Sequence, residues 1–225
     1  MTPEAVLRRL RAMASPANAA GMARFGIRPR TAVLGISVWQ LRGLAKELGP
    51  DHRLARALWA SGMHEARILA AYLEVPDRVT EAQAERWVAA FDSWDICDQV
   101  VELFARTPFA KKKVREWSGR QEEFVKRAAF SLIAELAVHD KEMTDREFQR
   151  YFPLIRRAAA DERNFVRKSV NWALRQIGKR NRALNTLAIK EARGLRGSAS
   201  RSARWIAADA LRELTSAAVQ ARLRR

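Results

Sequence analysis

The segment FVKRAAFSLI at residues 124–133 is followed by two related segments, FVRKSVNWAL at 165–174 and SARWIAADAL at 202–211. Their first residues are 41 and 37 positions apart, and MHEARILAAYL at 63–73 is a looser relative. Chance similarity among helices rich in Ala, Leu and Arg is the alternative explanation. The offsets and a basic pair near the start of the segments both recur, which favours a true structural repeat.

A helix pair that recurs at about 40 residues is typical of HEAT-type arrays, in which successive pairs stack and one helix of each pair lines a concave face. The sequence therefore predicts an all-α, curved, HEAT-like solenoid with a basic concave face. We expect one domain over residues 1–225, with an irregular segment at 1–36 and helix pairs over 37–225. The basic residues expected to line the groove are Lys126, Arg127, Arg167, Lys168 and Arg204.

Short breaks at glycine, proline and capping residues divide the chain into helices. Residues 15–36 are expected to be a loop with at most one short helix, Thr80 and Gln83 to form a capping box, and Pro153 to kink its helix. The expected helices are Pro3–Ala14, Ser37–Leu48, Asp51–Gly62, Met63–Leu73, Thr80–Phe91, Ser93–Ala105, Thr107–Trp117, Arg120–Val138, Thr144–Ala160, Asp161–Lys179, Asn181–Arg193 and Ser200–Arg222.

The charge is unevenly distributed along the chain. Residues 1–100 carry a net charge of +2 and residues 101–225 a net charge of +15, within a total of +17. A solubilising surface is one explanation, but a localised excess of this size favours a polyanionic partner. Nucleic acid is a better candidate than a membrane surface, because the charges are spread over many helices and no run approaches the ~20 apolar residues of a membrane span.

Other site chemistries find little support. Cys97 is the only cysteine, so it can form no internal disulfide and no cysteine-rich metal site, and a reducing cytoplasm is expected. His52, His64 and His139 are far apart, so no metal-ligand spacing is present. A glycine-rich phosphate loop and a Ser-His-Asp arrangement are also missing from the sequence.

Two tryptophans are candidate site residues. Trp94 and Asp98 are four residues apart and share one helix face, whereas Asp95 points elsewhere and is placed to cap the helix N-terminus. Trp172 lies on a helix with Arg167 and Lys168, a setting that suits stacking against part of a polyanion. The alternative is that both tryptophans belong to the core, that Asp98 is a surface acid, and that Arg127 is one exposed arginine among many.

These elements together resemble the AlkD family of DNA alkylation repair glycosylases. The resemblance is carried by WDICD at 94–98, FVKRAA at 124–129, and NWALR at 171–175 after NFVRK at 164–168, and it covers about residues 34–214. It implies that Trp94, Trp172, Asp98 and Arg127 frame a damaged nucleotide and that Arg175 contacts DNA. Residues 1–33 do not align with the family pattern, and the segment 139–150 is extended relative to it.

The resemblance also implies a reaction. The expected enzyme hydrolyses the N-glycosidic bond of N3- or N7-alkylated purines in double-stranded DNA and requires no metal or cofactor. It is expected to be monofunctional and to leave an abasic site, and a monomer is the default expectation for its oligomeric state. The main alternative is a non-catalytic HEAT-repeat protein that binds DNA, because some relatives bind DNA without this activity. A protein-interaction scaffold is the third possibility, and the charge of residues 101–225 argues against it unless the partner is acidic.

Overall fold

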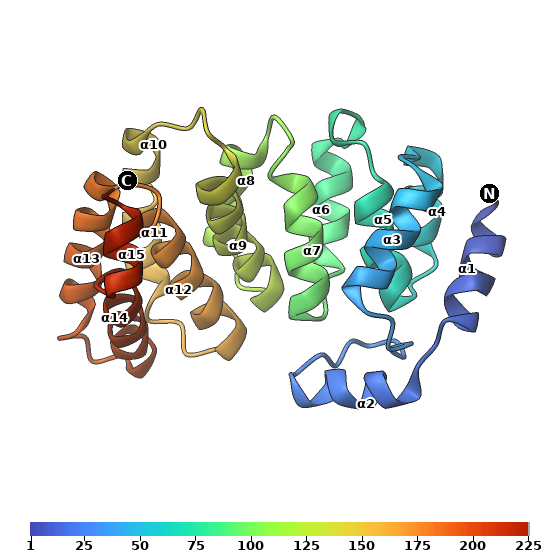
Figure 1. The fold of residues 1–225 in the computed structure, drawn as a ribbon, viewed down its shortest axis with the longest axis horizontal. Coiled ribbons are helices and arrows are strands. Elements are labelled where there is room, and N and C mark those ends of the chain that lie inside the picture. Colours follow the sequence, from blue (N-terminus) through green and yellow to red (C-terminus); the bar gives the residue numbers. More distant parts are fainter. Residues whose placement is uncertain (225) are drawn as a thin grey trace. The chain divides into compact units, whose positions relative to one another are not determined.

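The computed structural model describes residues 1–224, which form α-helices and one 3₁₀ turn and contain no strand. The predicted all-α class is therefore confirmed. The chain divides into two compact units, Met1–Pro108 and a second unit that begins at Phe109 (Figure 1). The single domain predicted over residues 1–225, with its curvature and concave face, stays a prediction.

In the first unit, α5 lies at the centre and contacts α3, α4 and α7. Its buried core includes the parallel stack of Trp59 on Trp87, whose ring centroids are 4.0 Å apart with an interplanar angle of 5°. Stacked indoles bury a large apolar area between two helices. The helices of this unit are α1 (Pro3–Ala12), α2 (Pro16–Arg24), α3 (Val38–Leu48), α4 (His52–Ala60), α5 (His64–Leu73), η1 (Pro76–Arg78), α6 (Glu81–Ala89) and α7 (Trp94–Phe104).

The short helix α2 falls within the stretch where a loop with at most one helix is expected. It buries none of its own residues, so hydrogen bonds with the segment around Gly35 position it, one of them from the Asn18 side chain to the Gly35 carbonyl. The amide of Ser15 donates to the carbonyl of Leu34 over 2.7 Å, and Gly35 adopts a positive φ of 79° beside it. A Cβ atom at Gly35 would lie 2.2 Å from the Ser15 carbonyl oxygen, so only glycine allows this close approach.

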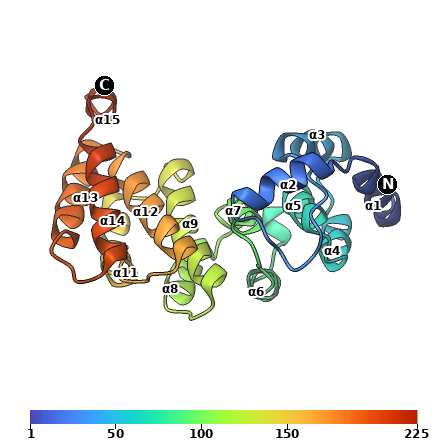
Figure 2. The same ribbon diagram turned by 90° about the horizontal axis from the view of Figure 1, so that it is seen from below.

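In the second unit, α12 packs between α9 and α14 (Figures 1 and 2). These three helices contain the three related segments, and their buried positions recur at the same offsets: Val125, Val166 and Ala203; Ala128, Ser169 and Ile206; Ala129, Val170 and Ala207. The helices of this unit are α8 (Ala110–Ser118), α9 (Glu123–His139), α10 (Asp145–Gln149), α11 (Phe152–Ala158), α12 (Asn164–Gly178), α13 (Arg182–Leu195), α14 (Arg201–Leu214) and α15 (Ala217–Arg222).

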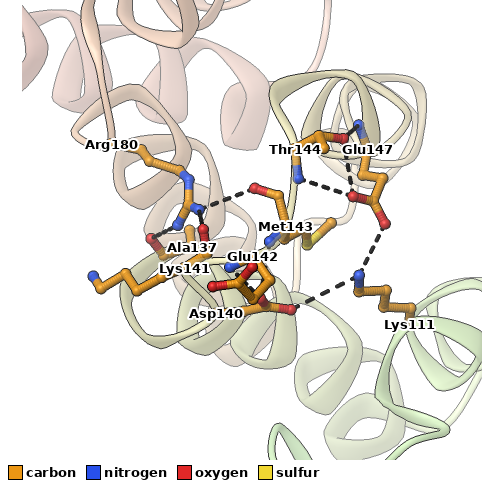
Figure 3. A network of polar contacts seen from close by, with 9 residues as sticks. All are labelled: Lys111, Ala137, Asp140, Lys141, Glu142, Met143, Thr144, Glu147 and Arg180. Carbon is orange, nitrogen blue, oxygen red and sulfur yellow. Dashed lines mark hydrogen bonds and ion pairs between the residues drawn. The ribbon is translucent and has the colours of Figure 1, made fainter.

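Polar contacts fix the segment that follows α9 (Figure 3). The Arg180 guanidinium donates to the carbonyls of Ala137, Lys141 and Met143. Thr144 and Glu147 form a capping box at the start of α10, and Lys111 donates to Glu147 over 2.8 Å. The Lys111 ammonium, together with hydrogen bonds from Thr144, lowers the pKa of Glu147 to about 2. These contacts hold the segment 139–150 within the second unit, and its extension relative to the family pattern stays a prediction.

Several expected helices are wrong in their boundaries. The predicted helix Thr144–Ala160 is not one kinked helix but two, because Pro153 lacks an amide hydrogen and sits instead in the first turn of α11. The predicted helix Ser200–Arg222 is also two helices, since the Ser216 hydroxyl caps a new start at Ala217. The helices expected from Thr107, Arg120 and Asp161 begin later, at Ala110, Glu123 and Asn164.

The capping box expected at Thr80 and Gln83 forms only in part. The Gln83 amide donates to the Thr80 hydroxyl over 3.1 Å, as predicted. The Gln83 side chain instead donates to the buried Glu74 carboxylate over 2.7 Å, and His52 lies 2.6 Å from the same carboxylate. An unpaired buried carboxylate costs more free energy than an unpaired group at a solvated helix end, so the Gln83 side chain bonds to Glu74 and not to the helix cap.

Candidate functional site

Trp94 and Asp98 lie on the first and second turns of α7, both partly exposed, as their spacing predicts. The Trp94 indole nitrogen donates to the carbonyl oxygen of Phe25 over 3.1 Å. Phe25 is the C-terminal cap residue of α2, and its own side chain is exposed. The N-terminal segment therefore orients the ring of Trp94, a contact that sequence reasoning missed.

Asp95 is fixed inside the first unit rather than presented to solvent. It is buried, accepts a hydrogen bond from the Ser93 hydroxyl over 2.5 Å, and lies 2.8 Å from Nε2 of the buried His64 on α5. Burial raises the pKa of Asp95, but hydrogen bonds with His64 and Ser93 outweigh it and hold the pKa below its usual value. Asp95 anchors the first turn of α7 to α5, and so positions Trp94 and Asp98.

A polar network lies one turn beyond Asp98 on α7. The Arg42 guanidinium donates to Glu102 over 2.8 Å and lies over the Tyr72 ring, 5.3 Å from its centroid, while the Tyr72 hydroxyl donates to Gln99. Arg42, Lys46 and Arg106 line a cavity of about 480 Å³ beside this network. These residues come from three helices and, in the case of Arg106, from the turn after α7, and no local sequence pattern singled them out.

Arg127 is buried in the second unit, only 6% exposed. Its Nη1 donates to the carbonyl of Phe165 over 2.7 Å, and the rings of Phe124 and Phe165 lie 5.5 Å apart between centroids. Arg127 thus ties α9 to the first turn of α12. The possibility that it is an ordinary exposed arginine is wrong, and its contact with a DNA phosphate stays a prediction.

Trp172 and Arg175 lie on α12, and both side chains are partly exposed. Arg175 forms an ion pair with Glu213 of α14 and lies 3.6 Å from Asp209, which also accepts a hydrogen bond from Asn171 over 2.6 Å. Burial by itself raises the pKa of Glu213. Lys179 and Arg175 together lower it by a larger amount, so the pKa of Glu213 is below its usual value. Arg175 therefore has an acidic partner within the protein.

The remaining predicted DNA contacts differ in their surroundings. Lys126 pairs with Asp161 over 3.1 Å, and Arg204 donates to the carbonyls of Ser198 and Ala199. Arg167 lies over the ring of Trp205, 4.6 Å from its centroid. Lys168 is exposed. Sequence reasoning missed Trp205, the tryptophan that Arg167 contacts. It directly follows Arg204 and occupies the repeat position of Lys168.

The predicted site residues fall into two sets. Trp94 and Asp98 belong to the first unit, whereas Arg127, Trp172, Arg175 and the other basic residues belong to the second. Within residues 1–224, no three His, Cys, Asp or Glu side chains are grouped closely enough to hold a metal ion. In that same range, no helix is both long and apolar enough to cross a membrane.

Comparisons with known proteins place this geometry in context. The sequence model of a family described as "DNA alkylation repair enzyme" matches residues 6–214. A search of curated proteins finds no match.

Among solved structures, the chain matches a member of "a new family of proteins related to the HEAT-like repeat DNA glycosylases with affinity for branched DNA structures". The TM-score is 0.77 at 17% sequence identity, and the match covers 86% of this chain and 83% of that one. The predicted HEAT-like fold is confirmed by this likeness. An engineered protein matches with a TM-score of 0.37 at 14% identity, over 78% of this chain and 90% of that one. A designed armadillo repeat protein matches with a TM-score of 0.33 at 15% identity, over 82% of this chain and 88% of that one.

Proposed function

The chain belongs to the family of DNA alkylation repair enzymes, and we propose that it is a monofunctional DNA glycosylase for alkylated purines. The observation that carries the proposal is the pair on α7, where Trp94 is held by the Phe25 carbonyl and Asp98 follows one turn later on the same face. A carboxylate beside an oriented aromatic ring suits a reaction that develops positive charge on a sugar.

The substrate chemistry explains why so few groups are needed. A purine alkylated at N3 or N7 carries a positive charge, so it leaves C1′ of the deoxyribose with the bonding electron pair and becomes neutral. The barrier lies in the oxocarbenium-like sugar that forms as this bond breaks. Asp98 stabilises that cation as a carboxylate and orients a water molecule, whose oxygen bonds to C1′ and whose proton is released. The products are a free base and an abasic site.

The other site residues bind the DNA in this proposal. Trp94 in the first unit and Trp172 in the second each present an aromatic face to the sugar-phosphate backbone, and such faces also attract a cation. Positive charge for phosphates comes from the basic residues that reach solvent, Lys126, Arg167, Lys168, Arg175 and Arg204. Arg127 is buried and holds α9 against α12. When a DNA phosphate approaches, it competes with Glu213 for Arg175 and with Asp161 for Lys126. The chemistry requires neither a metal ion nor an organic cofactor.

A second function, DNA binding without catalysis, is favoured by a separate observation. Arg127 and Arg175 both have partners within the protein, which is the arrangement expected of residues that stabilise the fold. A protein with affinity for branched DNA shares this fold. In this second proposal the basic surface binds DNA, and Asp98 has only a structural role.

Base release from a defined lesion tests the proposal. A duplex with one 7-methylguanine is incubated with the protein, and strand cleavage by alkali then reports the abasic site. We expect release well above the spontaneous rate and no strand cleavage before alkali treatment, as a monofunctional enzyme requires. Release at only the spontaneous rate, by folded protein that still binds the duplex, would contradict the glycosylase and favour the second function.

A further inference from the structure

Trp205 is an exposed tryptophan on α14 of the second unit. It is 37% exposed, whereas Trp59, Trp87 and Trp117 are buried in the core. By the repeat offsets, Trp205 occupies the position that Arg127 holds on α9 and Lys168 holds on α12. It therefore belongs to the same row of the repeat as two predicted DNA contacts, but it offers an aromatic ring instead of a charge.

Arg167 holds this ring in place. Its guanidinium lies over the indole, 4.6 Å from the ring centroid, and its Nη2 donates to the Asn164 side chain over 3.0 Å. One face of the indole is thus covered by a cation that is itself fixed to α12. The rest of the Trp205 ring is open to solvent. Because Arg167 already restricts the ring, it loses little conformational freedom when it stacks on a flat ligand.

The surroundings of Trp205 are cationic. Arg201, Trp205, Ala208 and Arg212 follow one another at four-, three- and four-residue steps on α14, so they share one face, and all four are exposed. The nearby acids already have partners: Asp209 pairs with Arg212 and Arg175, and Glu162 accepts hydrogen bonds from the Ser200 hydroxyl and the Ser202 amide. Ala208, next to Trp205 on this face, is a small exposed residue, and the arginines at either end suit phosphate groups.

We propose that Trp205, backed by Arg167, stacks on an unpaired nucleobase of DNA. The inference rests on the DNA binding proposed above and names a substrate feature, an unpaired nucleotide beside a duplex. In a continuous duplex the bases stack on one another and present only their edges, so an indole face has no base to bind. An unpaired base offers its π-face, while its phosphates bind the exposed Arg201 and compete with Asp209 for Arg212.

Two DNA ligands test the proposal. The first is a blunt duplex, and the second is the same duplex with a short single-stranded overhang that carries 2-aminopurine, whose fluorescence is quenched when it stacks. Affinities are measured by fluorescence anisotropy for the wild type, Trp205→Ala, Trp205→Phe and Trp39→Ala. Trp39 is a matched control because it is 84% exposed but lies on α3 in the first unit.

We expect the wild type to bind the overhang duplex more tightly and to quench 2-aminopurine. Trp205→Ala should lose about 10-fold in affinity for that ligand, lose the quenching, and keep its affinity for the blunt duplex. Trp205→Phe should retain part of both signals, and Trp39→Ala should behave as the wild type does.

Three results would each overturn the inference while DNA binding stands. The first is an equal loss of affinity for both ligands in Trp205→Ala, the second is wild-type affinity and quenching in that variant, and the third is the same loss in Trp39→Ala as in Trp205→Ala. If the wild type binds neither DNA, the proposed function fails as well.

Discussion

Arg127 and Lys168 occupy equivalent repeat positions, yet their surroundings are opposite. Arg127 is buried and donates to the Phe165 carbonyl, whereas Lys168 is exposed on α12. A buried guanidinium that satisfies a backbone carbonyl stabilises the fold, and removing it leaves that carbonyl unsatisfied. An exposed lysine contributes little to stability, but it remains available to a phosphate.

Replacing each of these two residues with methionine should separate the two roles. Arg127→Met should lower the free energy of unfolding by about 1–3 kcal/mol, since the Phe165 carbonyl loses its partner. Lys168→Met should change it by less than about 0.5 kcal/mol, but should reduce the salt dependence of DNA binding by about one phosphate contact. Urea unfolding and salt titrations measure both quantities, and equal stability losses would contradict the different roles.

The sequence predicted the placement of single residues better than their partners. The four-residue spacing of Trp94 and Asp98 was enough to put both on one face of α7. The Phe25 carbonyl that holds Trp94 is 69 residues away, and the Glu213 that pairs with Arg175 is 38 residues away. Such partners depend on how helices pack, so periodicity along one helix cannot reveal them.

At the scale of elements, Gly178 sets how closely α12, α13 and α14 pack. A Cβ atom there would lie 2.7 Å from Leu214 and 2.9 Å from Ala188, both in tightly packed positions. Gly178→Ala should therefore destabilise the protein by about 1–3 kcal/mol. Gly194→Ala on α13, where a Cβ would meet nothing within 4 Å, should stabilise it by about 0.4–1 kcal/mol through helix propensity. Thermal or urea unfolding gives both signs, and a stabilising Gly178→Ala would refute the close packing.

The turn that leads into α12 depends on the charge of Asp161. Hydrogen bonds from Arg163, and secondarily from Lys126, lower the pKa of Asp161 to about 2 from 3.8. Because the folded-state pKa is depressed, this stabilisation is present above about pH 4 and is lost as the pH falls toward 2. Asp161→Asn should cost about 1–2 kcal/mol at pH 7, and its deficit relative to wild type should shrink in acid. A deficit that is constant from pH 7 to pH 3 would rule out the charge as its cause.

Helix existence was readable from the sequence, but helix continuity was not. The capping residues Ser37, Asp51 and Thr144 mark true starts. Pro153 was expected to kink a helix and instead lies in the first turn of a new one, and Ser216 caps a break inside a stretch that reads as continuous helix. After the first break α11 contacts α8, α12 and α13, and after the second α15 contacts α14, so tertiary contacts accompany both departures from local propensity.

At the scale of the whole molecule, the charge of residues 101–225 should govern DNA affinity. Several of these Lys and Arg side chains have acidic partners within the protein, so each phosphate contact must compete with an existing ion pair. Affinity for duplex DNA should still fall by at least about 100-fold between 50 and 200 mM salt, because counterions are released on binding. Fluorescence anisotropy titrations measure this, and an affinity that hardly changes with salt would contradict a phosphate-binding surface.

The proposed reaction depends on one carboxylate, that of Asp98, and its removal tests the proposal most directly. The measurement is release of 7-methylguanine from a single-lesion duplex by the wild type, Asp98→Asn and the control Asp77→Asn, which removes the same charge from an exposed site in the same unit. We predict that Asp98→Asn slows base release by about 100-fold or more while its DNA affinity holds or improves, and that Asp77→Asn is unaffected. Base release by Asp98→Asn at the wild-type rate would contradict the assignment of Asp98 as the catalytic carboxylate.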